Sequence, residues 1–543
     1  MDGSWKVQER RRLHGHLLKR DHTLNGGILF GLEGHVIELQ ARAIEVLPQP
    51  MSITDCFRIT GMAGVAIQES RQRIEGAFAK LGIKTSEVEI LINLAPADLP
   101  KRGTWLDLPI AIILLQAAGI LPDLPDSKEG DFILVGELGL HGEIRRVPGA
   151  LSIAFNAKPG QSLIVPTGNE KECALILAKP GHEGCNVYPV SLLDHVIEFF
   201  NGKRKLDNAL KQKISYEPVI EPALDFGRIR GQEKAKRGAV ISAAGGHNLL
   251  LIGPPGEGKS LLAKAIAGIL PRLSDHEKVE LTRIYSATGQ LTHDGMAVTR
   301  RPMRILHHGT SIPAMIGGGS GVPKPGEITM AHLGVLFLDE MAEFSRQTLE
   351  SLRQPLEDGE INISRVEATL RFPCNFTLVA AMNPCPCGYF PAEKCKCSEK
   401  EVKKYQQKIS GPLCDRIDLQ VELRPLTTDE RFAEAEKDVS PRLRANVEAA
   451  RKIQLARYAE TSVPFNAAIP GGHVVDYCDF SERGFERFKE AVDQNELTTR
   501  NMDRIAKVAR TIADLEGVKR IESIHVEEAV TFVVGGILRE AFK

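Results

Sequence analysis

Apolar and polar positions alternate along the first part of the chain in a way that predicts mixed α/β structure. Between Ile28 and Asn201, "EVEILINLAPADLP" is typical of a strand that runs into a loop. "LDLPIAIILLQAAGIL" predicts a buried helix, and "FILVGELGLHGEIRRVPG" predicts a strand followed by a hairpin with glycine turns. This part is therefore expected to fold as an α/β domain.

A second pattern begins at Phe226. "NLLLIGPPGEGKSLLAKAIAGIL" reads as a strand, a Gly/Pro loop and an amphipathic helix, and "GVLFLDEM" and "CNFTLVAAMN" add two buried strands. Strands that alternate with helices predict a parallel sheet. After Pro425 the pattern turns helical, for example in "SPRLRANVEAARKIQLARYAE" and "TTRNMDRIAKVARTIADLEG".

These patterns divide the chain into five expected segments. A charged, proline-containing stretch of low apolarity, "NGKRKLDNALKQKISYEPVIEP", is typical of a linker. The expected segments are a basic N-terminal extension at 1–27, an α/β domain at 28–201, a linker at 202–224, an α/β core at 225–425 and a helical domain at 426–543.

The length and the charge of the chain indicate a multidomain protein without an overall basic surface. The 543 residues are too many for one hydrophobic core. The formal net charge of −1 provides no overall basic field, so any contact with DNA must use a local patch or the channel of an oligomer. The N-terminus has no secretory apolar core and no apolar run reaches membrane-spanning length. A cytoplasmic protein with reduced thiols and no membrane partner is expected.

The segment "GPPGEGKS" matches the phosphate-binding P-loop. Glycines let the backbone curl so that its N–H groups point at phosphate oxygens at a helix N-terminus. The lysine reaches the β- and γ-phosphates, and the serine binds Mg²⁺. A chance match in a glycine turn is the alternative, which the flanking strand and helix disfavour. The expected ATP-binding residues are Gly253, Gly256, Gly258, Lys259, Ser260 and Leu261.

Polar residues end the next two buried strands. Asp339, which follows "VLFL", is expected to hold Mg²⁺ through water, and Glu340 to orient or deprotonate the attacking water. The alternative for this pair is an acidic helix cap. Asn383, at the end of "FTLVAAM", is expected to sense the γ-phosphate and the attacking water. Its alternative is the start of an Asn-Pro turn.

The chain resembles the ComM/YifB family of bacterial AAA+ ATPases, which are often labelled magnesium-chelatase-like. The resemblance runs from Ile28 to the C-terminal helices and rests on "DFGRIRGQEKAKRG", "GPPGEGKS", "IGGGSGVPKPGEITMAHLGVLFLDEM", "LEDGEINISRVEATLRFP", "NPCPCG", "ISGPLCDRIDL" and "TTRNMDRIAKVARTIADLEG". It implies a hexameric ATP-driven motor that promotes DNA branch migration during natural transformation, with an AAA+ core and a helical lid.

The resemblance also assigns further residues. Arg416 in "GPLCDRIDL" occupies the arginine-finger position, which would reach the γ-phosphate bound by a neighbouring subunit. Arg500 in "TTRNMDR" occupies the sensor-2 position. An ordinary surface arginine is the alternative for each.

A hairpin is predicted over "LEDGEINISRVEATLRF", where Ile361 and Ile363 alternate with polar residues, with Arg365 near its turn. In this AAA+ clade such a hairpin projects into the central pore. The glycines and prolines of "IGGGSGVPKPGEI" suit a bent loop beside it. Arg365 and Lys324 are the candidate contacts to DNA phosphates, and a plain solvated hairpin is the alternative.

The N-terminal domain resembles the proteolytic domain of the Lon family in "NLAPADLPKRGTWLDLPIAI" and "VGELGLHGEIRRVPGAL". That enzyme uses a serine nucleophile and a lysine base. Asp107 occupies the serine position here and Leu151 the lysine position. The domain is therefore expected to be a catalytically dead scaffold for oligomerisation or DNA contact.

Four cysteines follow the sensor asparagine closely. Cys385, Cys387, Cys395 and Cys397 form two C-x-C pairs that could place four thiols around one zinc ion. Lysines in the same stretch would offset the charge of the thiolates. Inert or redox-responsive thiols are the alternative, and Cys414 is a possible substitute ligand.

Three other functions compete with the DNA motor. The "IGGGS" and "GPLCDRIDL" blocks are shared with the subunits that drive metal insertion into porphyrins. An ATP-dependent protease is disfavoured by the missing Ser/Lys pair, and a nucleotide-gated scaffold would not move along DNA. DNA-stimulated ATPase activity would separate the motor from the others.

Overall fold

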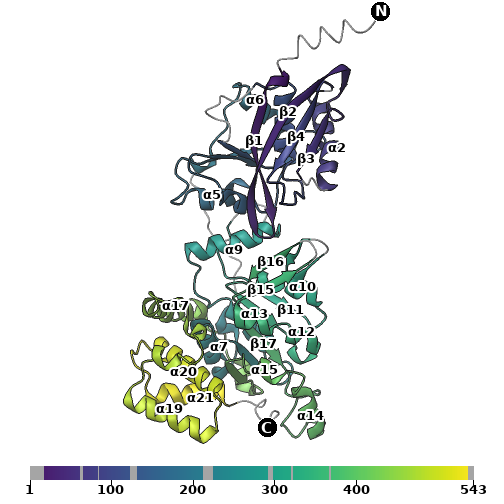
Figure 1. Cartoon of the computed structure of the whole chain (residues 1–543). Helices are drawn as coiled ribbons and strands as arrows, with labels where there is room; N and C mark the ends of the chain where they lie inside the picture. Colours follow the sequence, from purple (N-terminus) through teal and green to yellow (C-terminus); the bar gives the residue numbers. More distant parts are fainter. Residues whose placement is uncertain are drawn as a thin grey trace, which may run out of the picture. The chain divides into compact units, whose positions relative to one another are not determined.

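The computed structural model describes residues 17–61, 65–83, 85–122, 131–211, 224–291, 297–319, 322–365 and 368–535. Two units divide the chain: residues 1–217 with 275–299, and residues 218–274 with 300–543. Some of their helices and strands are labelled in Figure 1. None of the described helices is both long enough and apolar enough to cross a membrane.

The first unit contains one large mixed sheet. Its strands are β1 Asp21–Phe30, β2 Glu33–Ser52, β3 Phe57–Thr60, β4 Thr85–Ala95, β5 Phe132–Leu134, β8 Ser162–Pro166 and β9 Asn186–Val190, with the small pair β6 Glu137–Leu138 and β7 Ile144–Arg145. Its helices are η1 Leu17–Lys19, α2 Val65–Lys80, α3 Asp107–Ala117, α4 Ala150–Ala154, α5 Glu170–Leu177, α6 Leu193–Phe200, η2 Ala209–Lys211 and α9 Asp275–Ala287. The sheet order is β3-β4-β2-β1-β5-β8-β9.

Strand β1 begins at Asp21, before the boundary at residue 28 that the sequence suggested. It pairs along its whole length with β2, and Leu24 and Ile28 are buried. The glycines at 26 and 27 are needed because a side chain there would lie 2.7 Å from Leu106 and 2.4 Å from Ile153. This glycine-containing stretch is therefore a closely packed strand.

Helix α9 lies in the first unit, although its sequence position falls between the P-loop helix and the rest of the expected 225–425 core. The N–H of Gly149 donates to the backbone and side-chain oxygens of Ser286, both at 3.0 Å. The Ser286 hydroxyl donates to the buried carboxylate of Glu172. Helix α9 is therefore anchored to the rest of the first unit by polar contacts, although the chain on both sides of residues 275–299 belongs to the second unit.

The second unit is built on a parallel sheet. Its strands are β10 Leu249–Ile252, β11 Met303–Leu306, β14 Val335–Leu338, β17 Thr377–Met382 and β18 Leu419–Glu422, with the pairs β12 Gly317–Gly318 with β13 Lys324–Pro325 and β15 Glu360–Ser364 with β16 Thr369–Pro373. The order β11-β14-β17-β10-β18 is parallel throughout. This is the parallel core that the sequence predicted, and it is consistent with an AAA+ fold.

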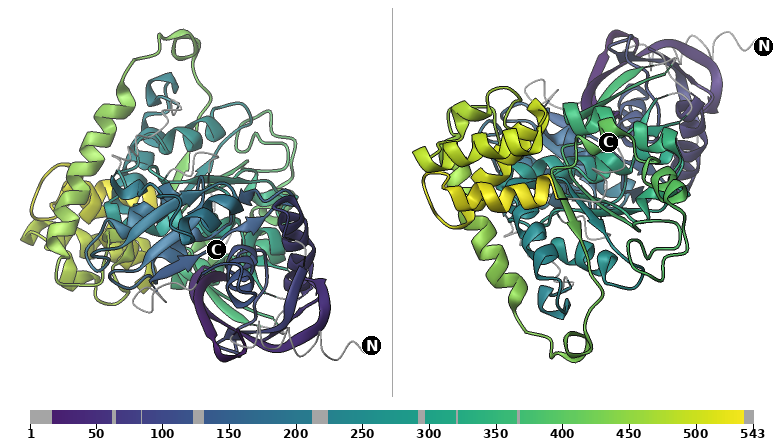
Figure 2. Two further views of the ribbon diagram at one scale, coloured as in Figure 1. Left: turned by 90° about the horizontal axis from the view of Figure 1, so that it is seen from above. Right: turned by 90° about the horizontal axis from the view of Figure 1, so that it is seen from below.

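The helices of this unit fall into those that precede β18 and a C-terminal group that follows it. The helices of this unit that precede β18 are η3 Phe226–Arg228, α7 Glu233–Gly245, α8 Lys259–Ile266, α10 Ile312–Ile316, α11 Glu327–Met330, η4 Met341–Glu343, α12 Arg346–Glu350, α13 Arg353–Asp358, α14 Glu399–Gln406 and α15 Gly411–Cys414. Those that follow β18 are α16 Thr428–Phe432, α17 Val439–Arg457, η5 Asn466–Ala468, α18 Val474–Tyr477, α19 Glu482–Asn495, α20 Thr499–Leu515 and α21 Ser523–Val533. Figure 2 shows the yellow C-terminal helices gathered side by side in both views.

Candidate nucleotide site

Three strand ends define the candidate site. Strand β10 lies between β17 and β18, and β14 lies on the other side of β17. Because all these strands are parallel, the residues that follow them meet at one edge of the sheet. The loop 253–258 follows β10, Asp339 follows β14 and Asn383 follows β17.

The P-loop glycines serve two different physical purposes. Gly256 and Gly258 have φ angles of 82° and 87°, in the left-handed region that favours glycine, and open space surrounds the position of an added Cβ. Gly253 instead lies against the neighbouring chain segment, where a Cβ would be 2.8 Å from the carbonyl oxygen of Leu423. The loop thus curls as phosphate binding requires, and the exposed Leu261 lies at the start of α8.

Lys259 is held by three hydrogen bonds. Its Nζ donates to the carbonyl oxygens of Gly253 at 2.6 Å and Pro254 at 2.8 Å, and to Oδ1 of Asn383 at 3.0 Å. Burial lowers its pKa to about 8, while the carboxylates of Asp339 and Glu257 act in the opposite direction. The lysine and the candidate sensor are therefore in direct contact.

The candidate magnesium ligands also meet. The Ser260 hydroxyl donates to Oδ2 of Asp339 at 2.8 Å, so both oxygens are placed where one Mg²⁺ could bind them. The ion would neutralise charge on the β- and γ-phosphates. Glu340 is exposed, has a left-handed φ of 53°, and its carboxylate lies 3.7 Å from Nδ1 of His308. It is accessible to a water molecule that it could activate as a general base.

Arg416 lies at the opposite end of β18 from the nucleotide edge. Its guanidinium donates to the carbonyl oxygen of Pro412 at 2.7 Å and to the carboxylate of Glu357, which holds the pKa of Glu357 below its usual range. Arg500 donates to Asp415 at 3.3 Å. The structure thus places both arginines at one location, and neither of these contacts involves the P-loop.

The two candidate DNA-binding loops are packed together. The hairpin is present: β15 and β16 pair antiparallel, with Ile361, Ile363 and Phe372 buried. Strand β12 pairs with β13 through Gly318 and Lys324. A Cβ on Gly318 would lie 3.2 Å from a guanidinium nitrogen of Arg365. Arg365 and Lys324 are therefore exposed on adjoining loops of one unit.

The four cysteines form one cluster, with all sulfur atoms within 4.8 Å of one another. Three of the sulfur–sulfur distances are 3.4, 3.6 and 3.8 Å. A tetrahedral zinc ion with bonds of about 2.3 Å has sulfur–sulfur edges of about 3.8 Å, so the donor set fits zinc. Backbone N–H groups of Lys396 and Tyr389 lower the pKa of Cys387 to about 6.

The cluster adjoins the P-loop. A Cβ on Gly388 would lie 2.7 Å from the side chain of Pro255. Cys414, the suggested substitute ligand, lies in α15 and is not among the four described cysteines that cluster. Its burial raises the pKa of the thiol to about 12. The role of Cys414 as a substitute ligand stays a prediction, and the four clustered thiols are by themselves enough for a tetrahedral site.

Asp107 in the N-terminal unit is fully buried, and both of its carboxylate oxygens accept hydrogen bonds. It accepts hydrogen bonds from Nε of Arg73 at 2.6 Å, from the Ser70 hydroxyl and from the N–H of Leu138 at 3.2 Å. Burial raises the pKa of the Asp107 carboxyl, although the hydrogen bonds from Arg73 and Ser70 act in the opposite direction. Leu151 is also buried, in α4. Neither residue offers a reacting group to a substrate.

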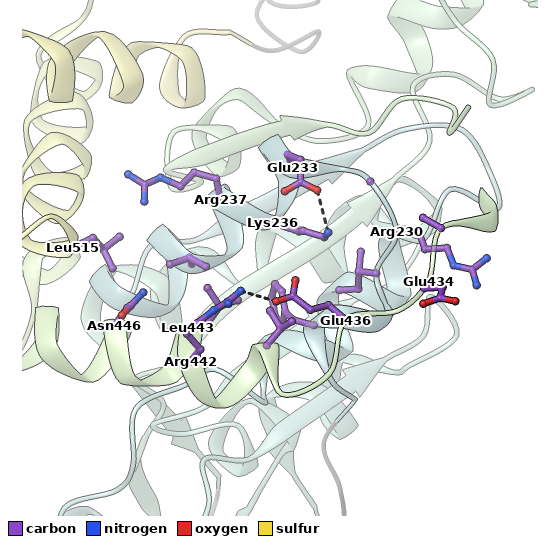
Figure 3. Close-up of a pocket in the computed structure, with 17 residues that line it drawn as sticks. Arg230, Glu233, Lys236, Arg237, Glu434, Glu436, Arg442, Leu443, Asn446 and Leu515 are labelled. Atoms are coloured by element: carbon purple, nitrogen blue, oxygen red, sulfur yellow. Dashed lines mark hydrogen bonds and ion pairs between the residues drawn. The ribbon is translucent and has the colours of Figure 1, made fainter. Parts of the chain in front are cut away.

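A cavity of about 470 Å³ opens between α7 and α17 (Figure 3). Its charged lining is largely paired, because Lys236 contacts Glu233 at 3.1 Å and Arg442 contacts Glu436 at 3.1 Å. None of its lining residues belongs to the loop 253–260. The cavity is therefore separate from the nucleotide site.

Glu257 is a residue that sequence reasoning missed. It occupies a variable position of the P-loop pattern, so the motif gives no signal for it. In the structure its carboxylate accepts from the N–H of Leu426 at 3.2 Å and from Arg431 at 3.3 Å. It joins the P-loop to the segment that leads into the C-terminal helices.

The parallel sheet, curled P-loop and acidic strand end define a protein of the P-loop AAA+ type. Models of the magnesium chelatase subunit ChlI match residues 225–431 and 51–169, and that of its C-terminal part matches 437–532. The chain belongs to the ComM/YifB family of magnesium-chelatase-like AAA+ proteins. This confirms the family that the motifs indicated.

The similarity to members of the family covers most of the chain. YifB of Salmonella typhimurium is 39% identical over 87% of this chain and 90% of its own length. The competence protein ComM of Haemophilus influenzae is 38% identical over 88% and 91%. The magnesium-chelatase 38 kDa subunit of Rhodobacter capsulatus is 28% identical over 30% of this chain and 51% of its own.

Proposed function

We propose that this protein is a cytoplasmic, hexameric, ATP-driven DNA motor that promotes branch migration during recombination in natural transformation. The observation that carries the proposal is the common surface formed by the hairpin and the β12–β13 loop, with Arg365 and Lys324 exposed on it. Two cations on adjoining loops suit contacts with a phosphate backbone, which are independent of sequence. The near full-length similarity to a competence protein supports the same function.

ATP hydrolysis drives this motor through residues at two edges of the sheet. Lys259, Ser260 and Asp339 bind Mg·ATP, Glu340 takes the proton from the attacking water, and Asn383 orients that water. Arg416 acts on the nucleotide of the next subunit, which its location away from the P-loop supports, and Arg500 serves as the sensor-2 residue of the helical domain. The N-terminal domain serves as a scaffold, since Asp107 and Leu151 are buried.

The test is ATPase activity with and without four-way or forked DNA, followed by a strand-exchange assay on the four-way junction. Stimulation of hydrolysis by DNA, and ATP-dependent movement of the junction, are expected. Because phosphate contacts dominate, binding should weaken steeply as salt rises. Normal hydrolysis that is insensitive to DNA, with a stationary junction, would contradict the motor.

A second candidate is a subunit that drives metal insertion into a porphyrin. The matches to ChlI models along the chain favour it. The partial coverage of the chelatase subunit disfavours it, since only 30% of this chain is aligned. Stimulation of the ATPase by a porphyrin acceptor complex in place of DNA would select this function.

The cysteine cluster holds one structural zinc ion per chain in this proposal. The four thiols have the spacing of a tetrahedral site, and the loop they close begins directly after Asn383. Protein purified without chelators should contain about one zinc per chain. The double variant Cys385→Ser/Cys397→Ser should lose the metal, whereas Cys478→Ser, at a buried cysteine outside the cluster, should retain it. Metal-free protein from such a preparation would refute the zinc site.

A further inference from the structure

Asn248 directly precedes β10, at the end of that strand opposite the P-loop, and its side chain joins two other segments. Its Oδ1 accepts from the N–H of Leu378 at 2.8 Å, and its Nδ2 donates to the carbonyl oxygen of Arg416 at 2.7 Å. A backbone N–H only donates and a carbonyl only accepts, so these partners fix which end of the amide is which. The residue therefore bridges β17 to the backbone of the candidate arginine finger.

The backbone of Asn248 strengthens the same junction. Its N–H donates to the Asp418 carboxylate at 3.1 Å, and its carbonyl oxygen accepts from the N–H groups of Asp418 at 3.1 Å and Leu419 at 2.9 Å. Asn248 is thus locked to the start of β18 whatever the conformation of its side chain. These backbone bonds fix the position of the Asn248 amide, so that it can restrain Arg416, two residues before Asp418.

The two ends of Arg416 are held in different ways. Among the residues that the structure describes, the guanidinium donates to the carbonyl oxygen of Pro412 and to the exposed carboxylate of Glu357, and a phosphate could replace both contacts. The backbone is held by the Leu413 carbonyl through its N–H at 3.0 Å and by Asn248 through its carbonyl. When the guanidinium leaves Glu357, the restraint from Asn248 remains.

Strand β17 connects this junction to the nucleotide edge. Leu378, near its start, is bonded to Asn248, and Asn383, directly after its end, contacts Lys259. We propose that Asn248 is a positioning residue that aims Arg416 at the nucleotide of the neighbouring subunit and couples it to the sensor strand of its own subunit. This rests on the proposed action of Arg416 on the neighbouring site.

Asn248→Asp tests the proposal with the smallest change. The aspartate can still accept from Leu378, but its second oxygen would face the carbonyl of Arg416 and repel it. Displacing a catalytic group by about 1 Å costs roughly 100-fold, so we expect ATPase activity to fall about 10- to 100-fold while ATP binding is unchanged. Asn156→Asp is the matched control, because it loses a similar 2.8 Å bond to the carbonyl of Gly34 in the N-terminal unit.

Subunit mixing separates a positioning role from general damage. Asn248→Asp should regain activity when mixed with Lys259→Ala, which supplies an intact Arg416, and should not when mixed with Arg416→Ala. Damage to the variant's own nucleotide site would give the reverse pattern and overturn the proposal. If Asn248→Asp does not assemble, Asn248→Ala, which removes both side-chain bonds, is taken through the same mixtures, and the same reversal would overturn the proposal.

The control mixture of Arg416→Ala with Lys259→Ala distinguishes the two possible failures. If this pair forms mixed oligomers without regaining activity, the action of Arg416 on its neighbour is wrong and the role of Asn248 falls with it. If this pair regains activity and the Asn248 variants do not follow the pattern of Arg416→Ala, only the role of Asn248 is wrong.

Discussion

Two aspartates, one in each unit, show how a buried carboxylate with fixed partners differs from a partly exposed one. Asp107 is fully buried and its oxygens accept from Arg73, Ser70 and a backbone N–H. Asp339 is partly exposed and its Oδ2 accepts from the Ser260 hydroxyl, an interaction that a magnesium ion can replace. The comparison teaches that a carboxylate available to a ligand has an exchangeable partner, whereas Asp107 accepts hydrogen bonds from Ser70 and Arg73 and so connects α3 to α2.

Changing the acidic residue beside Asp339 should produce the largest effect on activity. Glu340→Gln keeps the shape of the side chain and removes the base, so we expect ATP hydrolysis to fall by about 100-fold or more with ATP still bound. Glu343→Gln, three residues further along and paired with Lys408, is the control and should hydrolyse normally. Parental hydrolysis by Glu340→Gln would show that the base lies elsewhere.

Measuring both stability and ATPase activity for variants of both aspartates tests the comparison between them. Asp107→Ala leaves the guanidinium of Arg73 without its carboxylate partner, so we expect about 3 kcal/mol lower free energy of unfolding. The ATPase activity of the folded fraction should be unchanged. Asp339→Ala should abolish hydrolysis and leave stability nearly unaltered. Chemical denaturation and ATPase assays on both variants would reveal a reversed outcome.

The sequence predicted the nucleotide edge well because its signals are local. A buried strand followed directly by a polar residue specifies where Asp339 and Asn383 lie, and two glycines with left-handed φ angles need no distant partner. The hairpin was also predictable, because Ile361 and Ile363 alternate with polar residues, and the structure buries both side chains. The period of apolar residues and the spacing of motifs suffice to predict a contact when the two partners are close together in the sequence.

Long-range partners could not be predicted in the same way. Nothing in the pattern of "SDHEKVELTRIYSA", which forms α9, indicates that Ser286 meets Glu172 of the N-terminal unit. The pairing of Arg500 with Asp415 depends on how the C-terminal helices pack. Such contacts are decided by tertiary packing, which periodicity along the chain does not encode.

The lowered pKa of Lys259 predicts a pH dependence of ATP affinity, an effect of intermediate size. Its pKa is about 8 against an ordinary value of 10.5, and ATP binding needs the charged ammonium. Above pH 8, binding must take up a proton, so affinity should fall as pH rises, by at most about tenfold per pH unit.

The stability of nucleotide-free protein should change with the opposite sign. Between pH 8 and 10.5 the unfolded chain binds more protons at this lysine, so stability rises with pH there. Lys259→Arg should flatten both profiles because arginine stays charged. Nucleotide titration and thermal unfolding across this range would measure them, and identical slopes in the two proteins would exclude Lys259 as the titrating group.

The smallest expected effect on hydrolysis is at the candidate DNA surface, where the comparison extends to two arginines of one hairpin. Arg365 is exposed beside Gly318, whereas Arg371 on the return strand is paired with Glu360 at 3.3 Å. Arg365→Ala should weaken DNA binding severalfold for all sequences and reduce the salt slope by about 1 for each phosphate that the protein no longer neutralises. Arg371→Ala, the matched control, should bind DNA almost as the parent does.

The two variants should differ in movement more than in chemistry. Arg365 lies on a different loop from the residues that contact Lys259, so basal ATPase activity should be largely intact in Arg365→Ala. Branch migration of a four-way junction, measured at matched ATPase rates, should slow in Arg365→Ala and continue in Arg371→Ala. Arg365 differs from Arg371 in lying against the neighbouring loop. Equal branch-migration rates in the two variants would therefore mean that Arg365 does not couple hydrolysis to DNA movement.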